Sequence, residues 1–265
     1  MKSSDDEAGM TEVSRRKAYA TAVQKLLAAQ KPARGTAAYS RHVNRPLGRR
    51  VAAWGSTVGM TPDQATGLSA VLSGSGIALL ATVPPRWWSG LLIGLLLAAG
   101  YVMDSVDGQL ARLGGGGSVR GEWLDHTVDC FKTLTLHAAV LIGFFRWPPV
   151  DSDAVLLIPL GYLVVATATF FGWILMWSLR AAKPTSTVLA DPAPESPWRR
   201  FLLLPTDYGA LCIAFSVWGL PVVFLAVYSF FFIASAGALA LALMKWWREL
   251  SEWDRARSAQ GTVVG

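Results

Sequence analysis

The sequence predicts an all-α integral membrane protein, with six transmembrane helices preceded by a cytoplasmic interfacial amphipathic helix. Of its 265 residues, 52% are hydrophobic and only 16% are charged, which is more apolar than is usual for a soluble domain of this length. Several segments reach the roughly 20 apolar residues that a membrane-spanning helix needs. The net charge of +6 comes from Lys and Arg that gather outside these segments. In a membrane protein this pattern favours a positive-inside bias and attraction to anionic lipid over nucleic-acid binding.

The segment before the first span has a different character. Residues 1–38 form a polar N-terminal arm that we expect to be partly disordered, although Val13–Gln30 could form a helix with a modest apolar face. Tyr39–Gly55 is basic and amphipathic, which is typical of a helix lying in the plane of the membrane interface. Its apolar side chains recur at helical spacing against four arginines: Val43, Leu47, Val51 and Trp54 against Arg41, Arg45, Arg49 and Arg50.

Six apolar segments follow, within a membrane domain that we place at residues 39–250. The fifth and sixth are separated by little more than Gly219-Leu220, which predicts a tight helical hairpin. We expect residues 251–265 to be a disordered tail. The predicted spans are Asp63–Val83, Trp87–Arg112, Glu122–Phe145, Ala154–Leu179, Thr206–Trp218 and Pro221–Trp246.

The distribution of basic residues predicts the orientation. Most Lys and Arg precede the first span or follow the second, fourth and sixth spans, whereas the other connections hold only Arg86 and Arg146. The positive-inside rule then places both termini in the cytoplasm, in a multi-pass protein of the plasma membrane.

Four carboxylates flank the connection between the second and third spans, on the cytoplasmic side. Asp104 and Asp107 are spaced i, i+3 near the end of one helix, and Asp125 and Asp129 are spaced i, i+4 near the start of the next. Each pair therefore shares a helix face. Two antiparallel helices joined by the Leu113–Arg120 loop can aim all four at a common point.

Carboxylates at the edge of a membrane are unfavourable unless cations accompany them. Hard oxygen ligands suit Mg²⁺, Mn²⁺ or Ca²⁺, and four carboxylates suit a pair of ions better than one Mg²⁺ that keeps its waters. Two metal ions can clamp the oxygens of a phosphoryl group, and a base beside them could deprotonate an incoming hydroxyl. The pattern thus predicts transfer of a phosphoryl-linked group.

The segment Asp104–Asp129 reads Asp-x₂-Asp-Gly-x₂-Ala-Arg-x₈-Gly-x₃-Asp-x₃-Asp. It resembles the signature of the CDP-alcohol phosphotransferases at every specified position. The resemblance implies an enzyme of phospholipid biosynthesis, in which an alcohol attacks a CDP-linked donor, usually CDP-diacylglycerol, and releases CMP. It also implies a homodimer, since members of the family are often dimeric.

The resemblance assigns roles to the residues of the signature. Asp104, Asp107, Asp125 and Asp129 would hold two divalent cations, Mg²⁺ or Mn²⁺, and Asp129 would also take the proton of the acceptor hydroxyl. The donor would be contacted by Gly108, Ala111, Arg112 and Gly121. Guanidinium and phosphate pair bidentately, which suits Arg112.

A second segment, Thr61-Pro-Asp63…Thr66, opens the first span. By itself it predicts only a helix start, because Thr is a good N-cap and Pro suits the first turn. The family often carries a similar segment near the nucleotide, so Thr61, Asp63 and Thr66 are further candidates for contact with the donor.

The acceptor stays open. Lys132 lies on the carboxylate side of the third span, where it could bind an acceptor phosphate or offset the aspartates. Further residues that border the cytoplasmic cavity could read the acceptor head group, although the positive-inside rule explains the basic ones equally well: Arg180, Lys183, Arg199, Arg200 and Asp207. We expect His126 to be structural and assign no role to His137. Glycerol 3-phosphate, inositol phosphate, serine, an amino alcohol or another lipid would all suit the signature. Between the fourth and fifth spans, Pro205-Thr-Asp207-Tyr stands in place of the Arg-Pro-Glu-Arg-like run that we associate with inositol-phosphate enzymes, which disfavours that acceptor.

A cation transporter is the alternative from another functional class, because intramembrane carboxylates also bind ions in transit. A transporter needs acidic groups near the midplane and a polar path across the membrane. In this sequence the acids cluster at one edge of the spans, which favours the transferase.

Overall fold

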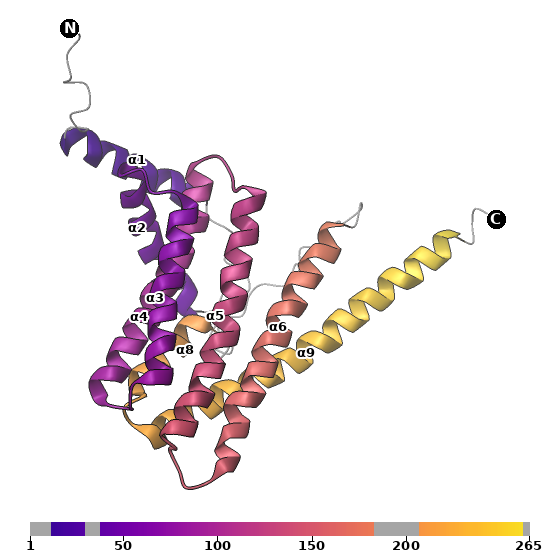
Figure 1. Cartoon of the computed structure of the whole chain (residues 1–265). Helices are drawn as coiled ribbons and strands as arrows, with labels where there is room; N and C mark the ends of the chain where they lie inside the picture. Colours follow the sequence, from indigo (N-terminus) through magenta and orange to yellow (C-terminus); the bar gives the residue numbers. More distant parts are fainter. Residues whose placement is uncertain (1–11, 30–37, 183–206, 262–265) are drawn as a thin grey trace.

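A computed structural model of the chain describes residues 12–29, 38–182 and 207–261, and all secondary-structure elements in these ranges are helices (Figure 1). A π-helix, η1, leads directly into α2, and the 3-10 turns η2 and η4 adjoin α6 and α8. The elements in chain order are α1 (Glu12–Ala28), η1 (Ser40–Asn44), α2 (Arg45–Thr57), α3 (Pro62–Thr82), α4 (Trp87–Leu113), α5 (Val119–Arg146), η2 (Asp153–Leu156), α6 (Leu157–Ala181), α8 (Tyr208–Ala214), η4 (Phe215–Val217) and α9 (Pro221–Gly261).

Five of these helices are long and apolar enough to cross a membrane, which is consistent with a multi-pass membrane protein. They correspond to the first, second, third, fourth and sixth predicted spans. The fifth predicted span, Thr206–Trp218, is described only from Asp207, and it forms the short helix α8 followed by η4. The ten residues Tyr208–Val217 rise about 15 Å as a helix, which is half of a bilayer core. The count of six spans stays a prediction.

The segment α8–η4 lies alongside one half of α4. Gly209, near its start, faces the rings of Tyr39 and Tyr101, whereas Gly219, just past its end, lies against the backbone of Arg86. Because Tyr101 is in the middle of α4 and Arg86 caps its start, α8–η4 begins at half the depth of the bundle (Figure 1). This half-length element leaves space between α5, α6 and α9.

Small residues bring α3 and α4 together, as is common between membrane helices. The Ser69 hydroxyl donates to the carbonyl of Gly100 at 2.7 Å. A Cβ atom at Gly76 would lie 3.2 Å from the Leu97 side chain. At the end of the bundle that carries the carboxylates, the starts of α3 and α5 are capped, because Thr61 and Gln64 form a capping box on α3 and Ser118 caps α5.

Aromatic side chains form the core at the opposite end. Phe144 of α5 stacks on Trp218 with ring centroids 5.9 Å apart, and Phe224 and Tyr228 of α9 pack edge-on against Phe144. All four side chains are fully buried or nearly so. This cluster anchors the α8–η4 segment and the first turns of α9 to the long helices.

The face of α2 that packs on α4 differs from the apolar stripe noted in the sequence. Gly48, Ala52 and Ala53 are buried, and Gly48 lies against Ser105 and Gln109 of α4. Val43, Leu47 and Trp54 are exposed instead. Small residues thus serve the protein contact and leave large apolar groups outside, as a helix at a lipid interface requires. The interfacial placement stays a prediction.

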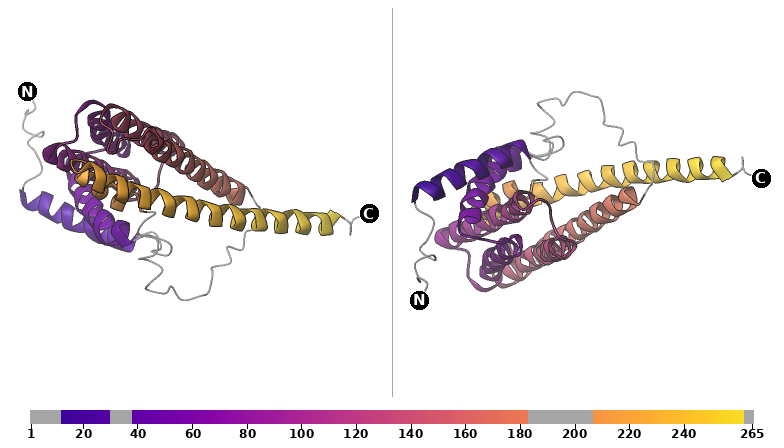
Figure 2. Two further views of the ribbon diagram at one scale, coloured as in Figure 1. Left: turned by 90° about the horizontal axis from the view of Figure 1, so that it is seen from below. Right: turned by 90° about the horizontal axis from the view of Figure 1, so that it is seen from above.

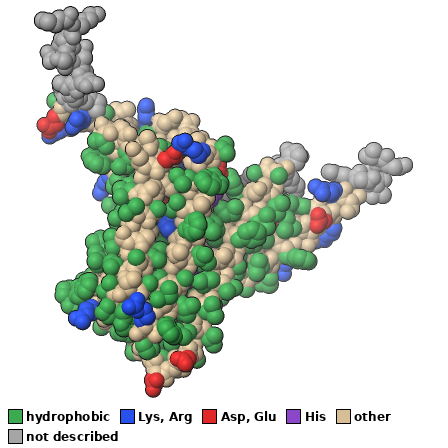
Figure 3. Space-filling view, in the orientation of Figure 1, with side chains coloured by type: hydrophobic (Ala, Val, Ile, Leu, Met, Phe, Trp, Pro, Cys, Tyr) green, Lys and Arg blue, Asp and Glu red, His purple; other side chains and the backbone are tan. Residues whose placement is uncertain are grey.

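The long helix α9 runs to Gly261, so the expectation of a disordered tail from residue 251 was wrong for most of that segment. Its last turns consist of good helix formers and polar residues, and Arg255 donates to the backbone of Ser251. The α6 helix packs along α9 at three levels, through Gly161 against Phe232, Gly172 against Trp246, and the Arg180–Glu249 ion pair (Figure 2). Hydrophobic side chains cover the flanks of the helices, and most charged side chains in view lie toward the ends (Figure 3).

Adding a methyl group at Gly90 is expected to loosen the attachment of the η4 segment. A Cβ at this position would lie 2.7 Å from the backbone oxygen of Ser216. Because this oxygen belongs to the backbone, the clash can be relieved only if one of the two helical segments moves. We expect Gly90→Ala to destabilise the protein by about 1–3 kcal/mol, as overpacked cores do. Thermal unfolding of the detergent-solubilised protein measures the loss.

Gly74→Ala is the matched control, because a Cβ there would meet nothing within 4 Å. Its melting temperature is expected to equal that of the parent or exceed it slightly, since Ala is the better helix former. Equal melting temperatures for the two variants would contradict the close packing of η4 on α4.

Candidate active site

Three of the four signature carboxylates converge between α4 and α5. Carboxylate oxygens of Asp104, Asp125 and Asp129 lie within 4.8 Å of one another. Asp104 comes from the last part of α4, and the other two come from successive turns of α5. The helical spacing in the sequence therefore predicted their convergence correctly.

The fourth carboxylate, Asp107, is turned toward α3. Its side chain is 7% exposed, accepts a hydrogen bond from the Thr66 hydroxyl at 2.9 Å, and also accepts the backbone N–H of Gly108. Thr66 in turn bonds to the carbonyl of Pro62. Asp107 thus lies one turn from Asp104, on the same face of α4, with one partner on the neighbouring helix.

Lys132 is the cation of this cluster. Its ammonium group lies 2.5 Å from Asp104, 2.7 Å from Asp129 and 3.2 Å from the Ser69 hydroxyl. The side chain is buried, at 8% exposure. Of the two roles considered for Lys132, these contacts support the offsetting of the aspartates. They leave no ammonium hydrogen for an acceptor phosphate, since an ammonium group has three donors.

The charge balance of the cluster favours a further cation. One lysine offsets one of four carboxylates, and buried carboxylates without a compensating charge are strongly unfavourable. The oxygen atoms are of the hard type that Mg²⁺ and Mn²⁺ prefer. The residues present therefore fit a divalent metal site.

The start of α3 is tied to the start of α5 beside this cluster. Asp63 forms an ion pair of 2.5 Å with Arg120, and a Cβ at Gly121 would lie 3.4 Å from an Asp63 oxygen. The Thr61 hydroxyl accepts the N–H of Gln64 in the helix cap. Thr61 and Asp63 thus have structural partners, whereas Thr66 contacts the signature directly. All three lie at the end of the bundle that carries the carboxylate cluster.

Arg112 has hydrogen-bonding capacity left over. Its Nε atom is buried and makes no hydrogen bond within the described part of the chain. A Cβ at Gly108 would lie 3.5 Å from the Arg112 guanidinium, and one at Gly117 would lie 4.0 Å from the side chain of Ala111. A guanidinium with an unused donor beside an open glycine is a suitable partner for phosphate.

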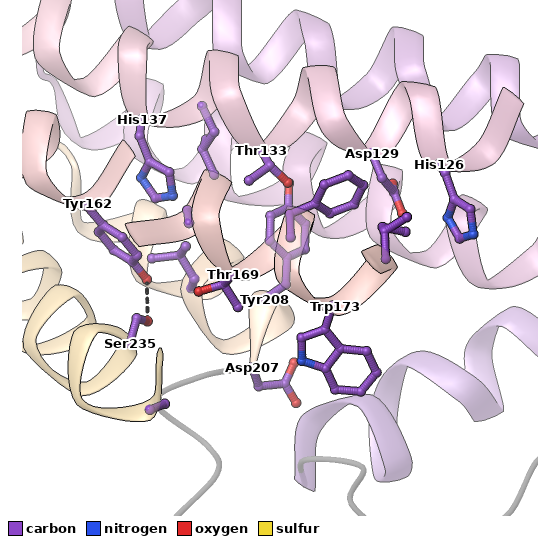
Figure 4. A pocket seen from close by; sticks show the side chains of 16 residues that line it. His126, Asp129, Thr133, His137, Tyr162, Thr169, Trp173, Asp207, Tyr208 and Ser235 are labelled. Carbon is purple, nitrogen blue, oxygen red and sulfur yellow. Dashed lines mark hydrogen bonds between the residues drawn. The ribbon is translucent and has the colours of Figure 1, made fainter. Parts of the chain in front are cut away.

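A cavity of about 400 Å³ opens on the other side of Asp129 (Figure 4). It is enclosed by parts of α5, α6, α8 and α9, and Asp129 is the one signature residue that lines it. The view shows Asp129 and His126 toward one end, and His137 and Tyr162 toward the other. The lining residues are His126, Asp129, Thr133, Leu136, His137, Tyr162, Ala166, Thr169, Phe170, Trp173, Ile174, Asp207, Tyr208, Leu211, Ser235 and Ala238.

Sequence reasoning missed most of this cavity. His126 was expected to be structural and His137 was given no role, yet both line it. Thr133 and His137 follow Asp129 by four and eight residues, so helical spacing could have identified them. Asp207, at the start of α8, does line the cavity as the sequence suggested. The other contributions of α8 and α9 carried no signal in the sequence, because they depend on how distant helices pack.

The basic residues that the sequence suggested for contact with the acceptor head group have other positions and partners where the structure describes them. Arg180 is bound bidentately by Glu249 of α9, at 2.8 and 2.7 Å, and it does not line the cavity. Outside the described residues lie Lys183, Arg199 and Arg200. Asp207 is buried, caps α8 through Gly209 and accepts the N–H of Ser40 at 3.0 Å.

Comparison with known proteins points to the same family as the signature in the sequence. A family model described as CDP-alcohol phosphatidyltransferase matches residues 60–246. An archaetidylinositol phosphate synthase of Pyrococcus horikoshii is 35% identical over 106 residues, which are 40% of this chain and 53% of that protein. The chain thus spans about half the length of this curated relative.

Among solved structures, the chain is similar to a phosphatidylinositol phosphate synthase of Mycobacterium tuberculosis with CDP-DAG bound. The sequence identity is 22% and the TM-score is 0.47, with 76% of this chain and 92% of that chain covered.

Replacing Lys132 by Met is expected to expose the charge imbalance of the cluster. Asp104 and Asp129 would lose a buried partner, which typically destabilises a protein by about 3–5 kcal/mol. We expect the variant to have a lower melting temperature than the parent. Addition of Mn²⁺ should raise the melting temperature of the variant by more than that of the parent, because the metal would then be the main counter-charge. Thermal unfolding with and without Mn²⁺ measures both effects.

Lys25→Met, on the exposed side of α1, serves as the control and should leave both measurements unchanged. A Lys132→Met protein as stable as the parent in the absence of metal would contradict the ion pairs.

Proposed function

The chain belongs to the CDP-alcohol phosphatidyltransferase family, and we propose that it transfers a phosphatidyl or related phospho-alcohol group from a CDP-linked donor to an alcohol. The donor we expect is CDP-diacylglycerol, and the products are a phosphodiester and CMP, in phospholipid biosynthesis. The observation that carries this proposal is the convergence of Asp104, Asp125 and Asp129, which lie in the segment that resembles the family's signature and within the residues 60–246 that the family model matches. Cation transport, the alternative, has no support from the family match.

We assign the donor to the side of the cluster formed by α3 and α4. Arg112, with its unused buried Nε atom, would hold the diphosphate, and Gly108 and Ala111 would let the nucleotide approach α4 closely. Thr66 would keep Asp107 oriented through its hydroxyl. The acyl chains of the donor would remain in lipid.

Asp104, Asp107, Asp125 and Asp129 would hold two divalent cations, Mg²⁺ or Mn²⁺. When bound, such ions neutralise a diphosphate and stabilise charge on the attacking and leaving oxygens. The hard oxygen ligands of the cluster fit either ion. Measurement of CMP release with Mg²⁺ and with Mn²⁺ distinguishes them.

Asp129 is the residue we propose as the general base. It lines both the carboxylate cluster and the cavity, so a hydroxyl entering from the cavity meets it first. The proton of that hydroxyl passes to an Asp129 oxygen while the hydroxyl oxygen forms a bond to the lipid-linked phosphorus. The bond from this phosphorus to the bridging oxygen breaks, and CMP leaves with that oxygen and its electron pair.

Orientation and assembly complete the proposal. We propose that the end of the bundle carrying the cluster faces the cytoplasm, with both termini on the same side, because Arg and Lys flank that end in the sequence. A homodimer is proposed on the resemblance to the family, and the mass of the detergent-solubilised protein in sedimentation tests it.

The central test is metal-dependent release of CMP from CDP-diacylglycerol by the purified protein. Asp129→Asn keeps the size of the side chain and removes the base, so CMP release is expected to fall by about 10²-fold or more. The thermal stability of the variant should be close to that of the parent. Mn²⁺ binding, measured by electron paramagnetic resonance, separates loss of the base from loss of a metal ligand.

Asp151→Asn, at an exposed position in the loop that follows α5, is the control for this substitution and should keep full activity. A fully active Asp129→Asn protein would remove the assignment of the base. Absence of metal-dependent CMP release from every CDP-alcohol tested would remove the proposed reaction.

Arg112→Ala is expected to weaken donor binding more than it slows turnover. Loss of a hydrogen bond to a charged group is worth about 1.5–3 kcal/mol, which corresponds to a rise in KM for the donor of about tenfold or more. Steady-state CMP release at varied CDP-diacylglycerol measures it. Arg15→Ala on α1, an exposed arginine, is the control, and an unchanged donor KM in Arg112→Ala would contradict the assignment.

A further inference from the structure

The cavity beside Asp129 is elongated and follows α5 away from the carboxylate cluster. His126 and His137 both line it, and their separation of eleven positions corresponds to about 16 Å along a helix. Its volume of about 400 Å³ is within the range of small-molecule binding sites. A ligand that fills it would reach from the proposed base far into the part of the bundle that lipid surrounds.

Most of the lining is apolar or aromatic, including Leu136, Phe170, Trp173 and Ile174. Three of the lining hydroxyl groups bond to the protein, whereas the buried Tyr208 hydroxyl has no hydrogen-bond partner within the described residues. Thr169 donates to the carbonyl of Val165 at 2.7 Å, and Tyr162 and Ser235 bond to each other at 3.2 Å. The far end of the cavity therefore offers chiefly surface that excludes water.

The fixed charges of the lining are negative. Asp129 lies at one end and Asp207 lies beside Trp173 (Figure 4), and among the described residues that line the cavity there is no lysine or arginine. Lys132 is turned to the other side of α5, where it pairs with Asp104 and Asp129. A phosphate group in this low-dielectric space would face two carboxylates, and like charges there repel strongly.

The wall formed by α6 and α9 closes the cavity to one side. Gly161 faces the Phe232 ring, and a Cβ there would lie 2.8 Å from it. Farther along, Arg180 and Glu249 join the same two helices. The space is therefore a built feature of the bundle, held open because the half-length α8 occupies only part of the gap.

We propose that this cavity binds the body of the acceptor, and that the acceptor is an uncharged alcohol carried on an apolar chain, a lipid alcohol in place of a phosphorylated polyol. This inference rests on the proposed transferase reaction and names its acceptor class. The hydroxyl would lie at Asp129, and the chain would extend past Thr133 toward Tyr162. The apolar lining provides the affinity, since each buried methylene group adds to binding.

Three alcohols that share one head group test the proposal. Glycerol, sn-glycerol 3-phosphate and a short-chain 1-monoacylglycerol differ only in what one glycerol oxygen carries: a proton, a phosphate or an apolar chain. CMP release from CDP-diacylglycerol by the purified full chain is measured with each. We expect kcat/KM for the monoacylglycerol to exceed that of the other two by tenfold or more. A higher value for sn-glycerol 3-phosphate, or for inositol phosphate in the same assay, would overturn the proposal.

Two variants on α9 locate the binding. Ala238 lines the cavity and Ala240 is exposed two residues farther along, so Ala238→Phe fills the space while Ala240→Phe does not. We expect Ala238→Phe to raise KM for the monoacylglycerol about tenfold and to leave KM for CDP-diacylglycerol unchanged, whereas Ala240→Phe behaves as the parent. A raised KM for CDP-diacylglycerol alone would show that the cavity holds a donor chain, and the proposal would fail.

Donor binding separates failure of this inference from failure of the proposed reaction. Metal-dependent stabilisation of the protein by CDP-diacylglycerol reports on the donor side without any acceptor. If the donor stabilises the protein and only phosphorylated acceptors release CMP, the acceptor class is wrong and the transferase stands. If the donor neither binds nor yields CMP with any acceptor, both fail.

Discussion

Carboxylates must be compensated wherever an apolar helix bundle buries them, and this constraint governs the end of the protein that carries the signature. Lys132 supplies part of the compensating charge, because its ammonium group contacts both Asp104 of α4 and Asp129 of α5. Ser69 of α3 takes the remaining contact at 3.2 Å, so one buried cation joins three helices. The same Ser69 hydroxyl bonds to Gly100, which couples the electrostatics of the cluster to the close packing of α3 on α4.

The opposite end of the bundle obeys a different constraint, since it contains no such charges among its core residues. Phe144, Trp218 and Phe224 fill it with aromatic contacts, which stabilise a core through area and geometry and require no partner charge. Trp218 ends the α8–η4 segment there, while Asp207 begins it near η1 through its bond to Ser40. A short segment fixed at both ends can leave a cavity beside it without collapse of the neighbouring helices.

The sequence was informative where chemistry depends on spacing along one helix. The i, i+4 relation of Asp125 and Asp129, with the i, i+3 relation of Asp104 and Asp107, was enough to predict a shared site. It could not predict that Asp107 turns to Thr66 or that Glu249 engages Arg180, because these contacts join helices far apart in the chain. Hydropathy identified the short apolar segment at Thr206–Trp218 but not that it begins beside the middle of α4, since composition does not report depth.

The arrangement divides the proposed site into two halves that meet on one helix. Asp125 and Asp129 face α4 and the signature, whereas Asp129, Thr133 and His137 border the cavity formed with α6, α8 and α9. Asp129 is the residue common to both halves, so a group transferred between them must pass its side chain. The α5 helix fixes the distance from Asp125 and Asp129 to the far end of the cavity through its 1.5 Å rise per residue. In the proposed reaction, the choice of acceptor would therefore depend on α6, α8 and α9, while α3, α4 and the signature would serve the donor and the chemistry.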